Sequence, residues 1–184
     1  MKIAISYPPI TNKRGQTAMV SQNRNVQFFK TPTYLLPIIE AQAATWLRDL
    51  GYDLKWDDGN SQLKSYKKWF ADLVNWEPNI VVFESTTPVM KFYWKTTNDL
   101  RKKLPKTIFI MTGYHSMKRP EETLKKSTTD IVLKSNHIDF ALVNLIPYIE
   151  KNPKWRISCP IEGLTIRVTK NKILDTGAFR QVQP

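Results

Sequence analysis

Small polar residues follow two short apolar runs in the middle of the chain, and they are the first candidates for a binding site. The runs are Ile80 to Phe83 and Ile108 to Met111, and the polar residues are Ser85-Thr86-Thr87 and Gly113-Tyr114-His115-Ser116. Uninterrupted apolar runs of this length predict central strands of a parallel sheet, buried on both faces. The carboxyl ends of such strands share the edge where ligands bind, so both polar segments should line one site.

The same residues also have structural explanations. Ser85-Thr86-Thr87 can cap the helix that Pro88 opens, although exposed amides at that helix start can also hold a phosphate or a carboxylate. Gly113 suits a tight turn with a positive φ, and His115 suits a hydrogen-bonding loop position better than a metal site. Asp57-Asp58-Gly59-Asn60 is favoured as a turn over a metal-binding acid pair.

Short apolar runs and helical stripes of apolar residues predict the elements that position these segments. Strands are expected over 3–7, 52–56, 80–83, 108–111 and 130–133, with helices over 34–50, from Ser61 towards Pro78, over 89–103, from Pro120, and over 138–149. Right-handed crossovers arrange the five parallel strands in the order 2-1-3-4-5 between two layers of helices, a three-layer doubly wound α/β domain. The polar segment 10–33 is expected to form a long loop.

The end of the chain follows a different pattern. Residues 1–152 are expected to form the α/β domain, and 153–184 a small β-hairpin, within 164–174, and a tail appended to it. Ser135-Asn136 is expected to cap the last helix.

The composition fits one intracellular domain. The chain of 184 residues can bury a single core, and its net charge of +12 favours an anionic partner: nucleic acid, a phosphate-bearing ligand or an acidic protein. Its one cysteine, Cys159, excludes an internal disulfide and an iron–sulfur cluster within this chain, and favours the cytoplasm. No apolar run reaches the roughly twenty residues of a membrane span, so no membrane partner is expected.

Basic residues are concentrated in one part of the sequence. Between Val89 and Lys126 there are ten basic residues and three acidic ones. Solvated helix faces often have such a composition, but an excess of this size also attracts a polyanion. The Lys/Arg surface of 91–126 is therefore a candidate contact for nucleic acid or an acidic protein.

Six segments of the sequence follow one another in a recognisable order. They are Met1-Lys2-Ile3-Ala4-Ile5-Ser6-Tyr7-Pro8-Pro9, Leu50-Gly51-Tyr52-Asp53-Leu54, Glu77-Pro78-Asn79-Ile80-Val81-Val82, Thr112-Gly113-Tyr114-His115-Ser116, Pro120-Glu121-Glu122-Thr123-Leu124 and Ile161-Glu162-Gly163-Leu164. In this order they resemble the cobalamin-binding domain that precedes the catalytic barrel in many radical S-adenosylmethionine (SAM) enzymes. The likeness covers nearly the whole chain and depends on the order and spacing of its motifs.

The resemblance implies a flavodoxin-like (Rossmann-like) fold with a corrin ring on the carboxyl-end rim. Carried over by position, the cobalamin-binding residues are Pro9, Ser85, Thr86, Thr87, Gly113, Tyr114, His115, Ser116, Ser135 and Asn136. The sequence departs from the family at Tyr114, where a small residue is usual, and at Lys134-Ser135-Asn136-His137, which replaces an Arg-Gly-Glu type of turn. The Asp-x-His-x-x-Gly signature that ligates cobalt in other cobalamin proteins is also missing.

Two functional hypotheses from different classes follow. The first is a cobalamin-binding-like module without its own catalytic centre, which holds a corrinoid for a partner chain or a missing barrel. The second is a repurposed basic domain that binds nucleic acid or an acidic protein without a cofactor. A flavin or nucleotide binder is disfavoured because no glycine-rich phosphate loop follows the first strand.

Overall fold

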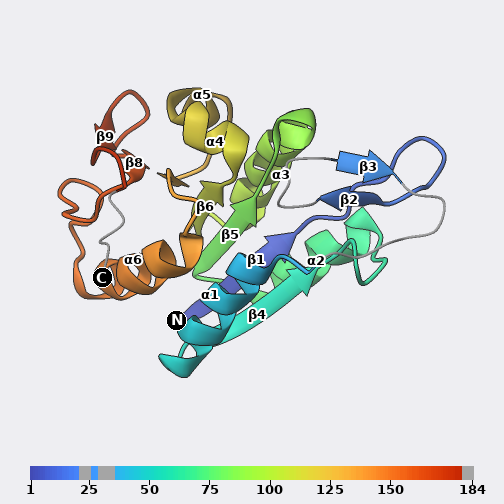
Figure 1. The fold of residues 1–184 in the computed structure, drawn as a ribbon, viewed down its shortest axis with the longest axis horizontal. Coiled ribbons are helices and arrows are strands. Elements are labelled where there is room, and N and C mark those ends of the chain that lie inside the picture. Colours follow the sequence, from blue (N-terminus) through green and yellow to red (C-terminus); the bar gives the residue numbers. More distant parts are fainter. Residues whose placement is uncertain (21–25, 29–35, 180–184) are drawn as a thin grey trace.

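The computed structural model describes residues 1–20, 26–28 and 36–179, and its centre is a seven-stranded sheet in the order β4-β1-β5-β6-β7-β8-β9 (Figure 1). The first five strands in that order are parallel to one another. Their bounds are Asp53–Asp58 for β4, Lys2–Tyr7 for β1, Ile80–Glu84 for β5, Ile108–Thr112 for β6 and Ile131–Leu133 for β7. The chain reverses its direction across the sheet between β1 and β5, which makes that position a switch point.

The C-terminal hairpin extends the sheet, so the expected count of five strands is wrong. Strand β8 (Leu164–Arg167) pairs antiparallel with β7, and β9 (Ile173–Asp175) pairs antiparallel with β8. Leu164 and Ile166 are fully buried in the core beside α6. The hairpin joins the sheet because β7 offers an open edge and the hairpin has an apolar face to bury. The domain boundary expected at residue 152 stays a prediction.

A second, two-stranded sheet lies within the segment expected to be a loop. Strand β2 (Ala18–Val20) pairs antiparallel with β3 (Val26–Phe28). The expectation of an unstructured segment over 10–33 is therefore wrong for these two strands, and its parts 21–25 and 29–33 lie outside the described residues.

Helices cover both faces of the large sheet. One face packs against α1 (Ile38–Asp49) and α6 (Ile138–Lys151), and Ile3, Ile5 and Val82 point into that layer. The other face packs against α2 (Tyr66–Trp76) and α3 (Met90–Lys103), with Val81 and Phe83 inside. The short helices α4 (Tyr114–Lys118) and α5 (Pro120–Lys126) lie beside α3. A one-turn 3-10 helix, η1 (Thr87–Val89), comes directly before α3.

The starts of α1, α2 and α6 differ from expectation. Helix α1, expected to start at residue 34, starts at Ile38 with Pro37 as its N-cap. The N-cap of α2 is Ser65, whose hydroxyl accepts a hydrogen bond from the Lys68 amide at 3.2 Å, whereas Ser61 belongs to a turn that Asp58 holds. Helix α6 starts at His137 as N-cap, so Ser135-Asn136 precedes the cap. In the described part of the chain no helix is long and apolar enough to cross a bilayer.

Candidate functional site at the carboxyl edge of the sheet

The two polar segments after β5 and β6 meet at the carboxyl edge, as the sequence predicts. The Ser85 amide donates to the Thr112 carbonyl oxygen at 3.0 Å. Gly113 has a φ of 93°, and a Cβ atom at this position would lie 2.0 Å from the Ser85 carbonyl oxygen. Only glycine permits this backbone approach, so contact between the two segments explains Gly113 without a ligand.

The serine hydroxyls of the two segments point into the protein. Ser85 Oγ lies 3.4 Å from Ser116 Oγ and 3.0 Å from Met90 Sδ, and both serines are buried. Helix α4 begins at Tyr114, so Ser116 is in a helix and the expectation of a loop there is wrong. These hydroxyls hold the two segments against α3, and they do not point outward to a ligand.

His115 also faces α3. Its ring packs edge-on against Trp94 with 5.7 Å between ring centroids, and its Nε2 lies 3.6 Å from Glu122 Oε2. The imidazole is therefore part of the packing between α3, α4 and α5. The expectation of a hydrogen-bonding loop position is wrong, because His115 lies in α4 and its Nε2 has no hydrogen-bond partner among the described residues. Among the described residues, no group of three or more His, Cys, Asp or Glu side chains could hold a metal ion.

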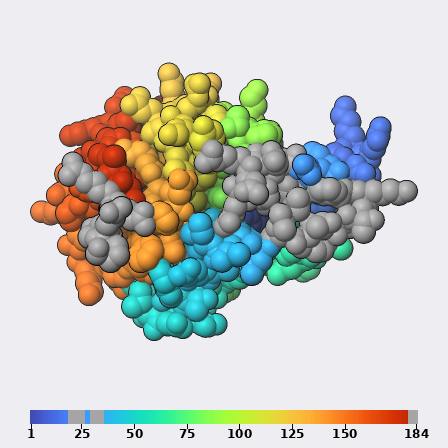
Figure 2. All heavy atoms as spheres, viewed as in Figure 1, coloured from blue at the N-terminus to red at the C-terminus, as the bar shows by residue number. Residues whose placement is uncertain are grey.

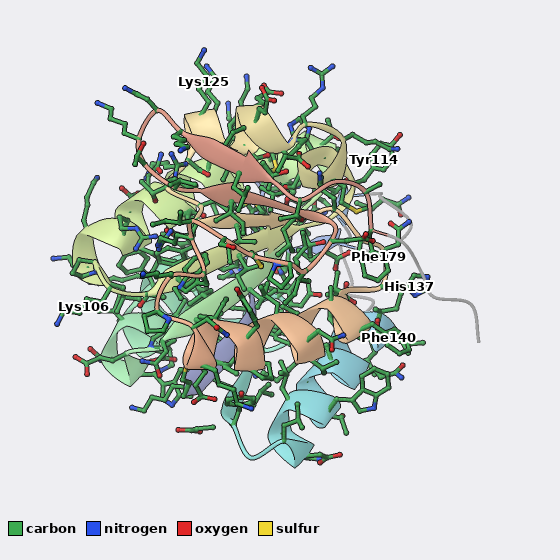
Figure 3. The ribbon with its side chains drawn as sticks, turned by 90° about the vertical axis from the view of Figure 1, so that its left-hand side faces the viewer. Lys106, Tyr114, Lys125, His137, Phe140 and Phe179 are labelled. Carbon is green, nitrogen blue, oxygen red and sulfur yellow. The ribbon has the colours of Figure 1, made fainter. Side chains whose placement is uncertain are left out.

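The remaining predicted site residues divide by exposure. Thr87, Tyr114 and Asn136 are exposed, while Thr86 and Ser135 are buried. Figure 3 shows Tyr114 on the same side of the molecule as His137, Phe140 and Phe179, and opposite Lys106.

Pro9 lies apart from the segments after β5 and β6. A Cβ atom at Gly59 would be 2.6 Å from Pro9 Cδ, and Asn60 Oδ1 accepts a hydrogen bond from the Ile10 amide at 3.0 Å. Pro9 is therefore packed against the turn that follows β4, on the far side of β1 from β5.

A buried cluster of acidic and phenolic groups lies at the switch point, and sequence reasoning missed it. Tyr7 at the end of β1 donates from its hydroxyl to Glu84 Oε2, at the end of β5, over 3.0 Å. Glu40 in the first turn of α1 is only 4% exposed, and its carboxyl group is hydrogen-bonded to that of Glu84. Two carboxyl groups in one buried site cannot both ionise easily, because each charge opposes the other.

Burial is the main cause of a raised pKa at Glu84. Desolvation, followed by the charge of Glu40, raises the pKa of Glu84 to about 8, against the opposing effect of the hydrogen bond from Tyr7. Burial and the charge of Glu84 likewise raise the pKa of Tyr7 well above its usual value. Glu84 therefore keeps a proton near neutral pH and donates it in its hydrogen bond to Glu40.

A third acidic side chain at this edge has an unused acceptor. Asp139, in the first turn of α6, is 4% exposed, and within the described residues its Oδ1 accepts no hydrogen bond. A buried carboxylate oxygen without a donor is unfavourable, so this atom favours a ligand or a water molecule that brings one.

Solved structures of two enzymes contain the same fold. The chain superimposes on the radical SAM methyltransferase TsrM from Kitasatospora setae with a TM-score of 0.67 and 13% identity, over 96% of this chain and 30% of TsrM. The same values hold for two TsrM structures. One contains tryptophan and a SAM analogue, and the other contains cobalamin and an iron–sulfur cluster. It superimposes on the cobalamin-dependent SAM radical enzyme OxsB, in a structure with aqua-cobalamin, with a TM-score of 0.69 and 11% identity over 98% of this chain.

The chain has the fold of one segment of these enzymes. It spans 30% of the TsrM chain and 22% of the OxsB chain, so most of each enzyme has no counterpart in it. The resemblance noted in the sequence is thus confirmed at the level of the fold. No family model and no curated protein matches the sequence.

Proposed function

We propose that this chain is a cobalamin-binding-like module of flavodoxin-like fold, which holds a corrinoid at its carboxyl edge for a catalytic partner domain or chain. The fold shared over nearly the whole chain with segments of two enzymes whose solved structures contain cobalamin is the observation that carries the proposal. Because the shared segment is less than a third of each enzyme, the catalytic machinery would belong to the partner. Cys159 alone cannot hold an iron–sulfur cluster.

The polar groups at the carboxyl edge suit a large ligand fringed with amides, as a corrin ring is. Thr87, Tyr114 and Asn136 are exposed there and would contact its periphery. Asp139 would accept an amide N–H through its unused oxygen. A bound corrinoid supplies a cobalt centre that carries an alkyl group. His115 is not proposed as its ligand because its ring is packed against Trp94.

A titration with hydroxocobalamin in about 0.5 M salt tests the proposal. At this salt concentration the Debye length is only roughly 3–10 Å, so nonspecific charge attraction is screened. Binding should change the visible spectrum of the cobalamin, and saturation at 100 times Kd should raise Tm by about 5–10 °C, because the ligand stabilises only the folded state. A spectrum and a melting curve that both stay unchanged would rule the module out.

A matched pair of variants locates the ligand. Thr87→Arg places a bulky cation at the proposed rim, whereas Thr45→Arg makes the same change on an exposed position of α1. Thr87→Arg should weaken cobalamin binding and Thr45→Arg should leave it unchanged. Equal affinity in both variants would place the ligand elsewhere.

A further inference from the structure

An open cavity lies at the amino-terminal edge of the sheet, opposite the candidate site. It has a volume of about 740 Å³ and lies between the end of α3, α5 and the β8–β9 hairpin. Its lining residues are Arg101, Glu121, Leu124, Lys125, Ser127, Thr128, Asp130, Arg167, Lys170, Asn171 and Ile173. Figure 2 shows the surfaces of α5, in yellow, and of the hairpin, in red, meeting beside this edge.

Three guanidinium groups surround the buried carboxylate of Asp130, one of the two acidic residues that line this cavity. Asp130, which directly precedes β7, accepts from Arg101 at 2.5 Å and from Arg156 at 2.9 Å, and its Oδ2 also accepts from the Phe109 amide at 2.8 Å. Arg101 is held in place by contact with the Phe109 ring, 4.6 Å from the ring centroid. The one buried carboxylate is therefore already paired with two cations.

Arg167 is the third guanidinium, and no described carboxylate pairs with it. Its Nε donates to the Thr129 carbonyl oxygen at 2.9 Å. Its Nη2 donates to the Ser127 carbonyl oxygen at 2.8 Å and also to the Leu124 carbonyl oxygen. Burial lowers the pKa of Arg167, and the charges of Arg101 and Arg156 lower it further against the opposing charge of Asp130. The half-buried charge thus has no ion pair with a described carboxylate, since Asp130, whose charge acts on it, is already paired with Arg101 and Arg156.

Arg167 caps carbonyl groups at the C-terminal end of α5, and this role explains its hydrogen bonds without a ligand. It does not explain the excess of positive charge at the cavity. A neutral donor would satisfy the same carbonyl groups, whereas four cationic side chains line the cavity with two carboxyl groups. Lys125 and Lys170 are exposed and form no ion pair with an acidic residue in the described ranges. Figure 3 shows Lys125 extended from the protein surface.

We propose that this cavity binds a phosphate-bearing ligand, with Arg167 at its floor and Lys125 and Lys170 at its mouth. Guanidinium groups match the geometry of phosphate oxygens, and the lysines add point charges that adapt to the ligand. The volume lies within the range of small-molecule sites, so the cavity admits a nucleoside diphosphate or a short stretch of nucleic-acid backbone. The site does not depend on the proposed corrinoid, which would bind at the other edge of the sheet.

Calorimetric titration with inorganic pyrophosphate in a low-salt buffer tests this site. Binding should saturate at one pyrophosphate per chain and weaken as salt is added. Lys125→Gln combined with Lys170→Gln should reduce the affinity about tenfold or more, because two charge-assisted contacts are lost. Lys91→Gln combined with Lys118→Gln removes the same charge from exposed positions outside the cavity and should leave the affinity within about twofold.

The outcomes separate a defined site from general attraction, and one source of phosphate from the other. Equal weakening in both double variants, or no saturable binding by the unmodified chain, would overturn the proposal. Where pyrophosphate binds, competition by ADP at lower concentration identifies a free nucleotide, and competition by a single-stranded oligonucleotide at lower concentration identifies nucleic-acid backbone. Both results support the site, and neither depends on the cobalamin titration.

Discussion

Replacing Glu84 with glutamine should make the protein more stable in mildly alkaline solution. In the folded chain the pKa of Glu84 is about 8, compared with an ordinary value of 4.5, because the partly buried side chain is desolvated beside Glu40. Below pH 4.5 the folded and unfolded states both hold the proton, so the raised pKa costs nothing there. Between pH 4.5 and pH 8 only the folded state keeps it, and stability falls as the pH rises.

The magnitude follows from the width of that pH window. Each pH unit within it costs about 1.4 kcal/mol of folding free energy, so the loss reaches at most about 5 kcal/mol near pH 8. Glutamine has no charge to desolvate, and its amide can still accept from Tyr7 and donate to Glu40. Glu84→Gln should therefore remove most of this loss and match the unmodified chain near pH 4.5.

Urea unfolding measured at pH 5 and at pH 8 gives the required comparison. Glu162→Gln is the matched control, since Glu162 is exposed and the same negative charge is removed. The gain of the Glu84 variant at pH 8 over pH 5 should exceed that of the control by about 1.5 kcal/mol or more. Equal pH profiles for the two variants would mean that Glu84 ionises normally, and the account of the buried cluster would be wrong.

Two further substitutions test the packing of the carboxyl edge. Tyr7→Phe should lower the free energy of unfolding by about 1–2 kcal/mol, because a hydrogen bond is lost. It should also extend the alkaline loss of stability to higher pH, because the hydrogen bond from Tyr7 lowers the pKa of Glu84. An unchanged midpoint in the plot of stability against pH would contradict this. Gly113→Ala should destabilise by about 3 kcal/mol or more in urea unfolding, since its Cβ would meet backbone at 2.0 Å. Gly15→Ala, at a φ of 75° in open space, should cost only about 1 kcal/mol, and similar losses for both glycines would refute the steric argument.

The parallel part of the sheet could be predicted because its signals are local. Ile80 to Phe83 and Ile108 to Met111 are apolar at every position, as strands covered on both faces require. The hairpin over 164–174 was recognised as a hairpin, but its docking on β7 depends on which edge of the sheet remains open. That information belongs to the tertiary arrangement and not to the residues of the hairpin.

The candidate site could be predicted only as far as the backbone positions it. The segments at Ser85 and Gly113 were expected to meet, and they do. Their side-chain directions were not predictable, since the hydroxyls of Ser85 and Ser116 turn inward towards Met90. A start of helix α4 at Tyr114 causes this for Ser116, and the sequence Tyr-His-Ser-Met has no strong helix signal.

The acid cluster left a fainter signal in the sequence. Glu84 is a lone carboxyl group at the end of an otherwise apolar run, and Glu40 follows two isoleucines at the start of a helix. Each position on its own is explained as the polar end of an element. Only the adjacency of β1 and β5 brings Tyr7 and the two acids together, so the pair could not be found without the strand order.

The two edges of the sheet differ in charge for a reason that lies in the topology. Each helix that follows a parallel strand begins at the carboxyl edge and ends at the amino edge, so the helix dipoles favour acids at the first and cations at the second. Glu40 and Asp139 lie in first turns, whereas Arg101 and Lys125 lie in last turns. The dipoles account for a moderate excess of cations at the amino edge. The end of α5 also accepts hydrogen bonds from Arg167, but a helix end supplies no full counter-charge for a half-buried guanidinium, and this residue is the reason to look for a phosphate there.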